Sequence, residues 1–100
     1  MKYILCGLVA MVLSGASHAA AVTAYCDKGI MADGHRVHVG ACAGPRWIPL
    51  GTRVVIGGEV YTVEDRTNRR LDGRYDIWRP WSRARCPKFG KRNMVVKVLG

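Results

Sequence analysis

The sequence has few acidic residues. Seven Asp and Glu stand against 16 Lys and Arg, which gives a formal net charge of +9 over 100 residues. A chain of this length holds one small domain at most. It has no run of sustained helical periodicity, no internal repeat and no linker. These absences exclude a helical bundle, a repeat array and a multidomain enzyme.

The common spacings of zinc ligands are also missing. The sequence has no Cys-x-x-Cys and no His-x-x-x-His. His35 and His38, together with the cysteines, are the alternative that would make a zinc site. Either histidine could also serve as an acid/base partner, but a surface histidine is the simpler interpretation. We therefore expect no metal and no cofactor.

The N-terminus predicts an exported protein. Lys2 precedes an apolar run over residues 3–13, and small residues follow it up to Ala20, which is typical of a secretory signal peptide. The run is too short to span a membrane, since a spanning helix needs roughly 20 residues. With cleavage after Ala19, the expected organisation is a signal peptide over 1–19 and one domain over 20–100. The expected location is secreted or periplasmic, with no transmembrane segment after processing.

Three cysteines, Cys26, Cys42 and Cys86, follow the expected signal peptide. A small exported domain has a thin core and often carries a disulfide, and an odd number leaves one thiol over. A Cys26–Cys86 bond would remove about 4 kcal/mol of denatured-state entropy, against about 3 kcal/mol for Cys26–Cys42. Geometry must still permit the pair, so entropy alone leaves both open.

Short β-prone runs separated by glycine turns predict a small barrel. Gly57-Gly58 between two such runs predicts a hairpin. The only helix expected covers residues 81–88, with Pro80 at its start. The fold class is therefore mainly β. The expected strands cover residues 21–26, 37–43, 52–56, 59–64, 74–78 and 93–99.

Two carboxylates flank the central loop. Asp65 follows the strand run 60–63, and Asp76 lies in the run 74–78, after a turn signalled by Asp72-Gly73. This arrangement is expected to hold both carboxylates near one place. Their pKa values then depend on pairing with the nearby arginines and on crowding. Paired carboxylates of this kind suit acid/base chemistry on a sugar or an amide.

Several motifs occur in the order of a known family. Together they cover residues 22–99 and resemble the 3D (three-aspartate) domain of the double-psi β-barrel superfamily. That group includes the barrel of membrane-bound lytic transglycosylase A, and rare lipoprotein A and the expansins share the barrel more distantly. The motifs are an opening strand at 22–26, Met31-Ala32-Asp33-Gly34, Ile48-Pro49-Leu50-Gly51-Thr52-Arg53-Val54, Glu64-Asp65-Arg66, Gly73-Arg74-Tyr75-Asp76-Ile77-Trp78, Phe89-Gly90-Lys91-Arg92 and a closing strand at 94–98.

The resemblance implies a six-stranded double-psi barrel that acts on peptidoglycan glycan strands. The implied reaction cuts the β-1,4 bond between N-acetylmuramic acid and N-acetylglucosamine, and the muramyl C6 hydroxyl attacks to give a 1,6-anhydro end. One carboxyl group protonates the leaving oxygen and then accepts the hydroxyl proton. By the motif, Asp76 is the acid/base and Asp65 its support. The resemblance also implies a Cys26–Cys86 disulfide.

One position departs from the family pattern. Where that pattern has its first aspartate, this chain has Gly44 followed by Pro45. The lytic transglycosylase also completes its groove with a second domain, which this chain is too short to contain. A non-catalytic, expansin-like module that binds cell-wall polysaccharide is therefore the alternative function.

The expected substrate contacts are Arg66, Arg74, Trp78 and Trp81. Aromatic rings stack on sugars but fill cores more often, and Trp81 is the one we expect to be exposed. Residues 66–97 carry eleven Lys and Arg against two Asp, so this segment would attract other anionic cell-wall polymers, or simply keep the protein soluble. Nucleic acid is not expected, because no nucleic-acid-binding fold signature accompanies the charge.

Overall fold

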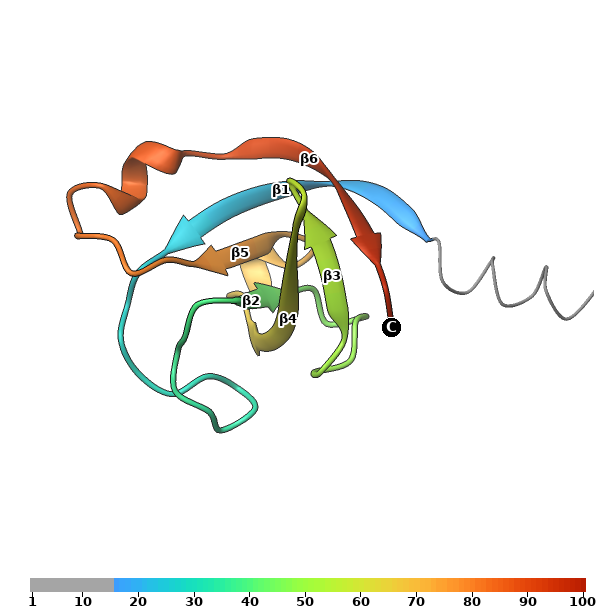
Figure 1. Ribbon diagram of the computed structural model, residues 1–100, viewed down its shortest axis with the longest axis horizontal. Helices are drawn as coiled ribbons and strands as arrows, with labels where there is room; N and C mark the ends of the chain where they lie inside the picture. Colours follow the sequence, from blue (N-terminus) through green and yellow to red (C-terminus); the bar gives the residue numbers. More distant parts are fainter. Residues whose placement is uncertain (1–15) are drawn as a thin grey trace, which may run out of the picture.

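The computed structural model describes residues 16–100 (Figure 1). The apolar run of the expected signal peptide therefore lies outside the described residues. The expected cleavage site after Ala19 falls within the first strand, β1 (Ser17–Tyr25). Over residues 16–100, no helix is long and apolar enough to cross a membrane.

Six strands close into one barrel, in the order β1-β5-β2-β4-β3-β6. Two short 3-10 helices connect them: η1 follows β4, and η2 precedes β6 (Figure 1). After β1, the elements are β2 (Ala41–Gly44), β3 (Arg53–Ile56), β4 (Glu59–Arg66), η1 (Arg69–Leu71), β5 (Tyr75–Trp78), η2 (Cys86–Phe89) and β6 (Arg92–Val98).

The barrel is mixed, with two parallel and four antiparallel pairings. β1 runs parallel to β5, and β2 runs parallel to β4. The other four pairs are antiparallel, and β1 with β6 closes the barrel. The prediction of a mainly β, closed six-stranded barrel is confirmed, and the topology is compatible with a double-psi barrel.

Two expected elements differ from the structure. The expected strand over 37–43 is reduced to β2, because the chain before it folds as a loop held by a bridge between Ile30 and Arg36. The short helix expected over 81–88 is replaced by turns and the 3-10 helix η2. Pro87 explains the second difference, since it lies inside the expected helix and has no N–H for an α-helical hydrogen bond, whereas it is tolerated in the first turn of η2.

The core follows the two-residue alternation of the strands. Val22, Val63, Tyr75 and Ile77 point inward and are almost fully buried. The hydroxyl group of Tyr75 reaches the edge of the core, where it lies 3.0 Å from Nε2 of His18. Residues between these inward positions, such as Asp76, therefore lie on the outer face of the barrel wall.

The expected disulfide is not present, although the structure places its two cysteines together. Cys26, Cys42 and Cys86 are all free thiols, and Cys26 and Cys86 line the same pocket. Cys42 lies apart in the core, where burial raises the pKa of its thiol to about 12. A protonated, buried thiol is unreactive, so Cys42 is the least reactive of the three by its position in the core.

Gly44 ends β2 with no room for a side chain. A Cβ atom at this position would lie 2.9 Å from Cγ1 and 3.2 Å from Cγ2 of Val63. Val63 is fully buried and branched at Cβ, so it has little freedom to move aside. A side chain at position 44 would point into the core. An aspartate here would therefore bury a carboxylate among apolar groups instead of joining Asp65 and Asp76.

Replacing Gly44 with Ala should lower the free energy of unfolding by about 1–3 kcal/mol, the usual cost of an overpacked core. Chemical denaturation of the purified variant measures this. The matched control is Val63→Ala in the same background. It removes both clashing methyl groups, so the double variant should lose less stability than the sum of the two single variants. Additive losses would contradict the packing argument.

Candidate functional site

Four neighbouring strands place Thr23, Asp76, Ala43 and Asp65 in one row across the sheet. Asp76 on β5 pairs with Thr23 on β1 and with Ala43 on β2, and Ala43 also pairs with Asp65 on β4. Directly paired residues face the same side of a sheet. The two carboxylates therefore project from the same outer face. They are separated by two strand spacings, about 10 Å between Cα atoms.

A β-bulge in β4 makes this row. Cys42 pairs with Val63, but the next residue, Ala43, pairs with Asp65, so Glu64 is an extra residue in the ladder. Without it, strict alternation would turn Asp65 inward with Val63. The bulge sends Asp65 to the outer face and frees Glu64 to contact the loop that precedes β2.

Asp76 sits in an environment that favours its protonated form. One oxygen accepts a hydrogen bond from the Thr23 hydroxyl group at 2.9 Å. Partial burial raises the pKa of the Asp76 carboxyl group. The Thr23 hydrogen bond and Arg74 lower it, whereas the negative charges of Asp27 and Asp65 raise it further, and the net direction is upward. Desolvation is the dominant cause.

Asp65 is held in place as an acceptor. Its Oδ1 accepts from the backbone N–H groups of Ala32 at 3.0 Å and Arg66 at 2.8 Å. Its Oδ2 accepts from the Tyr25 hydroxyl group at 3.3 Å. Burial and the Asp65 carboxylate raise the pKa of Tyr25, so this phenol stays protonated and able to donate. Asp65 thus ties β4 to β1 and to the loop ahead of β2.

Both carboxylates line one pocket of about 250 Å³. The loop after β1 and the segment after β4 supply its other walls. The lining residues are Tyr25, Asp27, Lys28, Gly29, Ile30, Val37, Ala43, Asp65, Arg66, Thr67, Asn68 and Asp76.

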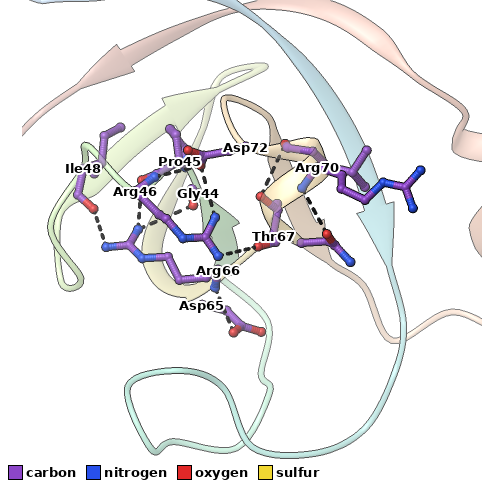
Figure 2. A network of polar contacts seen from close by, with 11 residues as sticks. Gly44, Pro45, Arg46, Ile48, Asp65, Arg66, Thr67, Arg70 and Asp72 are labelled. Carbon is purple, nitrogen blue, oxygen red and sulfur yellow. Dashed lines mark hydrogen bonds and ion pairs between the residues drawn. The ribbon is translucent and has the colours of Figure 1, made fainter.

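Arg66, an expected substrate contact, is engaged by the backbone. Its guanidinium group donates to the carbonyl groups of Pro45 at 2.9 Å, Ile48 at 2.7 Å and, more weakly, Gly44 at 3.4 Å (Figure 2). These bonds fix the turn after β2 against the end of β4. The side chain lines the pocket, but its donors are largely used within the protein.

A second set of bonds fixes the segment that carries η1. Arg46 donates from its backbone N–H to Asp72 at 3.0 Å and from its guanidinium group to the carbonyl of Thr67 at 3.2 Å (Figure 2). The Arg46 guanidinium also pairs with Asp72 at 3.5 Å. Arg69 and Arg70 remain on the exposed surface of η1.

The other expected contacts are spread around the pocket. Arg74 acts on Asp76 electrostatically but does not line the pocket. Trp78 donates from Nε1 to the carbonyl of Asp27 at 2.9 Å and lines a neighbouring pocket of about 230 Å³. Trp81 lies 4.5 Å from the guanidinium carbon of Arg85 and lines a further, wider hollow.

The expectation that Trp81 is the exposed tryptophan is wrong. Trp81 is half-buried against Arg85 and the ring of Phe89. Trp47 is the exposed one, with 64% of its surface accessible and its edge against the ring of His18. Trp47 follows Pro45 in a turn on the outside of the barrel, whereas the 3-10 helix brings Phe89 back over Trp81.

Some residues at the site were not foreseen from the sequence. Thr23 and Tyr25, which hold the two carboxylates, were seen only as parts of a strand. The bulge also creates a cluster in which Asp33, His35 and Glu64 place ligand atoms within 4.8 Å of one another. The adjacent acidic pair Glu64-Asp65 at a strand end was the available signal, because unbroken alternation would bury one of them.

Comparison with known proteins adds no relative. No family model matches the chain, and no curated protein matches it.

Replacing Asp76 with Asn should raise the free energy of unfolding at neutral pH. The folded protein raises the pKa of Asp76, so burying its charged form costs stability above that pKa. Asn keeps an oxygen for Thr23 and carries no charge. The gain should shrink as the pH falls through the folded-state pKa and vanish below the unfolded value. Denaturation curves of both proteins from pH 3 to 8, a range of about five units, test this; an Asn variant less stable at every pH would contradict it.

Proposed function

We propose that this protein acts on the glycan strands of peptidoglycan as a lytic transglycosylase-like enzyme, with a 3D-type double-psi barrel exported to the cell envelope. One observation carries the proposal. Asp76, which is half-buried and has a raised pKa, lines the same pocket as Asp65. A glycan-cleaving acid must carry a proton at working pH, and desolvation moves the pKa of Asp76 in that direction.

In this mechanism, Asp76 donates its proton to the glycosidic oxygen as the bond to the muramyl C1 breaks. The carboxylate left behind then accepts the proton of the C6 hydroxyl group as that oxygen attacks C1. No water enters, so a second catalytic carboxylate is not required, unlike in the two-carboxylate scheme of most glycosidases. Thr23 orients Asp76 through its hydrogen bond. The nearby Asp65 carboxylate contributes to the raised pKa of Asp76.

The pocket's size supports a second candidate, a non-catalytic polysaccharide-binding module. Its volume of about 250 Å³ falls below the range of about 300–1,000 Å³ common for ligand sites. A site this small holds only a short part of a glycan, so the remaining sugars would contact the surrounding protein surface. Arginines outside the pocket lining, Arg69 and Arg70 on η1 and Arg74 ahead of β5, would then supply much of the affinity for an anionic cell wall.

Asp76→Asn should reduce the release of 1,6-anhydromuropeptides from purified peptidoglycan by roughly 100- to 10,000-fold, the contribution of a positioned proton-transfer group. Asp65→Asn should cost less, because Asp65 supports the site. The matched control is Glu59→Gln, which neutralises an exposed carboxylate at the other end of β4. Mass spectrometry of the digests measures all four proteins. Unchanged release by Asp76→Asn would exclude it as the acid/base, and no release by wild type at any pH would favour the binding module.

Replacing Arg69, Arg70 and Arg74 together with Ser should weaken binding to anionic cell-wall sacculi. Exposed charges are screened beyond about 10 Å at 0.1 M salt, so wild-type binding should also fade as salt increases. The control replaces three exposed lysines that follow β5 in the sequence and removes the same charge. They are Lys88, Lys91 and Lys97. Co-sedimentation measures binding. Equal losses in the two triple variants would mean that net charge, and not this surface, governs binding.

A further inference from the structure

The loop between β1 and β2 brings three potential metal ligands together against β4. Nδ1 of His35 lies 2.9 Å from Oδ2 of Asp33 and 3.3 Å from Oε1 of Glu64. The ligand atoms of these three residues all lie within 4.8 Å of one another. One imidazole and two carboxylates grouped at this spacing can converge on a single ion, since zinc–ligand bonds measure about 2.0–2.2 Å.

Glu64 makes this cluster more than a surface group of acids. It is only 7% exposed, and a buried carboxylate needs a cationic partner. Within residues 16–100, its ion pairs are with two histidines: His35, and His38 through Nε2 at 2.6 Å. Neither imidazole carries a permanent charge. A bound cation would give Glu64 a permanently charged partner.

His38 has the hydrogen bonding expected of a residue that orients a ligand. Its Nδ1 lies 2.9 Å from the carbonyl oxygen of Val39, which fixes the ring. Its Nε2 then holds the second oxygen of Glu64. Carboxylates that bind metals are commonly hydrogen-bonded in this way by a neighbouring group. The first oxygen of Glu64 remains directed at His35 and Asp33.

The backbone builds the site before any ion arrives. The N–H of Met31 donates to the carbonyl of His35 at 2.8 Å, and that of Asp33 donates to the carbonyl of Glu64 at 3.0 Å. The N–H of His35 also donates to Oδ1 of Asp33 at 2.9 Å. Asp33 and His35 therefore sit on a closed loop that is already attached to β4, the strand of Glu64, and this lowers the ordering cost of binding.

We propose that Asp33, His35 and Glu64 bind one divalent transition-metal ion, for which zinc is the probe, and that His38 positions Glu64. The mixed nitrogen and oxygen ligands suit Zn²⁺ better than Mg²⁺ or Ca²⁺, which prefer oxygen alone. Three protein ligands leave a coordination position for water or a further ligand. The ion joins the loop to the bulge of β4. It thereby also fixes Ala32, whose N–H donates to Asp65.

Calorimetric titration of ZnCl₂ into the purified, chelator-treated protein tests the site. We expect one equivalent to bind, and the melting temperature to rise with it. His35→Ala should weaken binding by at least about 100-fold, since even outer partners of metal ligands cost 10- to 100-fold. His38→Ala should fall within that smaller range. His35 is largely exposed, so its loss should leave the fold intact.

The neighbouring thiols provide the necessary control. Cys26 and Cys86 are close enough to bind zinc themselves, so the titration is repeated with Cys26→Ser/Cys86→Ser. The proposed site requires that this variant keep the bound equivalent and that Co²⁺ in it give the absorption bands of a nitrogen- and oxygen-ligated ion. Loss of binding in the serine variant, full binding by His35→Ala, or no binding by wild type would each overturn the proposal.

Discussion

One extra residue in β4 determines the chemistry of the outer wall. The register passes from Val63 to Asp65 opposite two consecutive residues of β2, and Glu64 lies between them. The inserted residue turns Asp65 toward Asp76 and sends Glu64 to the histidines of the preceding loop. The acidic pair in the pocket and the Asp33–His35–Glu64 cluster therefore both depend on a single irregularity in a parallel pairing, where bulges are rare.

The barrel was predictable because it follows from local patterns. The strands β3 and β4 and the Gly57-Gly58 hairpin between them lie close to their expected limits. Asp65 and Asp76 were also expected to meet, and they line one pocket. These features depend on the alternation of apolar and polar residues and on turn-forming residues, and both can be recognised within short segments of the sequence. The fold class and the central acidic pair were accordingly within reach of the sequence.

The remaining details depend on long-range packing. The bulge at Glu64 arises from the fit of β4 against β2, and the role of Thr23 arises from the pairing of β1 with β5. Arg66 looked like a substrate contact, but the turn after β2 brings three carbonyl groups within its reach. A sequence motif does not show whether a side chain such as that of Arg66 contacts a substrate or hydrogen-bonds to the protein's own backbone. Gly44 is the same kind of case, since its neighbour across the core, Val63, is 19 positions away.

The site combines rigid support with an unfavourable electrostatic environment. Asp65 receives three hydrogen bonds, whereas Asp76 receives one from Thr23 and sits partly out of water near other carboxylates. Two carboxyl groups of the same chemical type thus stand in different surroundings, and those of Asp76 raise its pKa. Asp65, with three hydrogen bonds, stabilises the barrel wall. Asp76 is partly desolvated, which lowers the stability of the folded protein when Asp76 is charged, and a purely structural position would not require this.

The order of pairing around the barrel also constrains how the chain folds. Of the six ladders, only that of β3 with β4 joins consecutive strands. β1 and β3 each need β6, the last strand of the barrel along the chain, as a pairing partner. Folding dominated by such distant contacts is slow, and until β6 arrives two strand edges stay open to other chains. The whole segment from β1 to β6 must therefore be synthesised before the barrel can close, because β1 lies between β5 and β6 in the closed sheet.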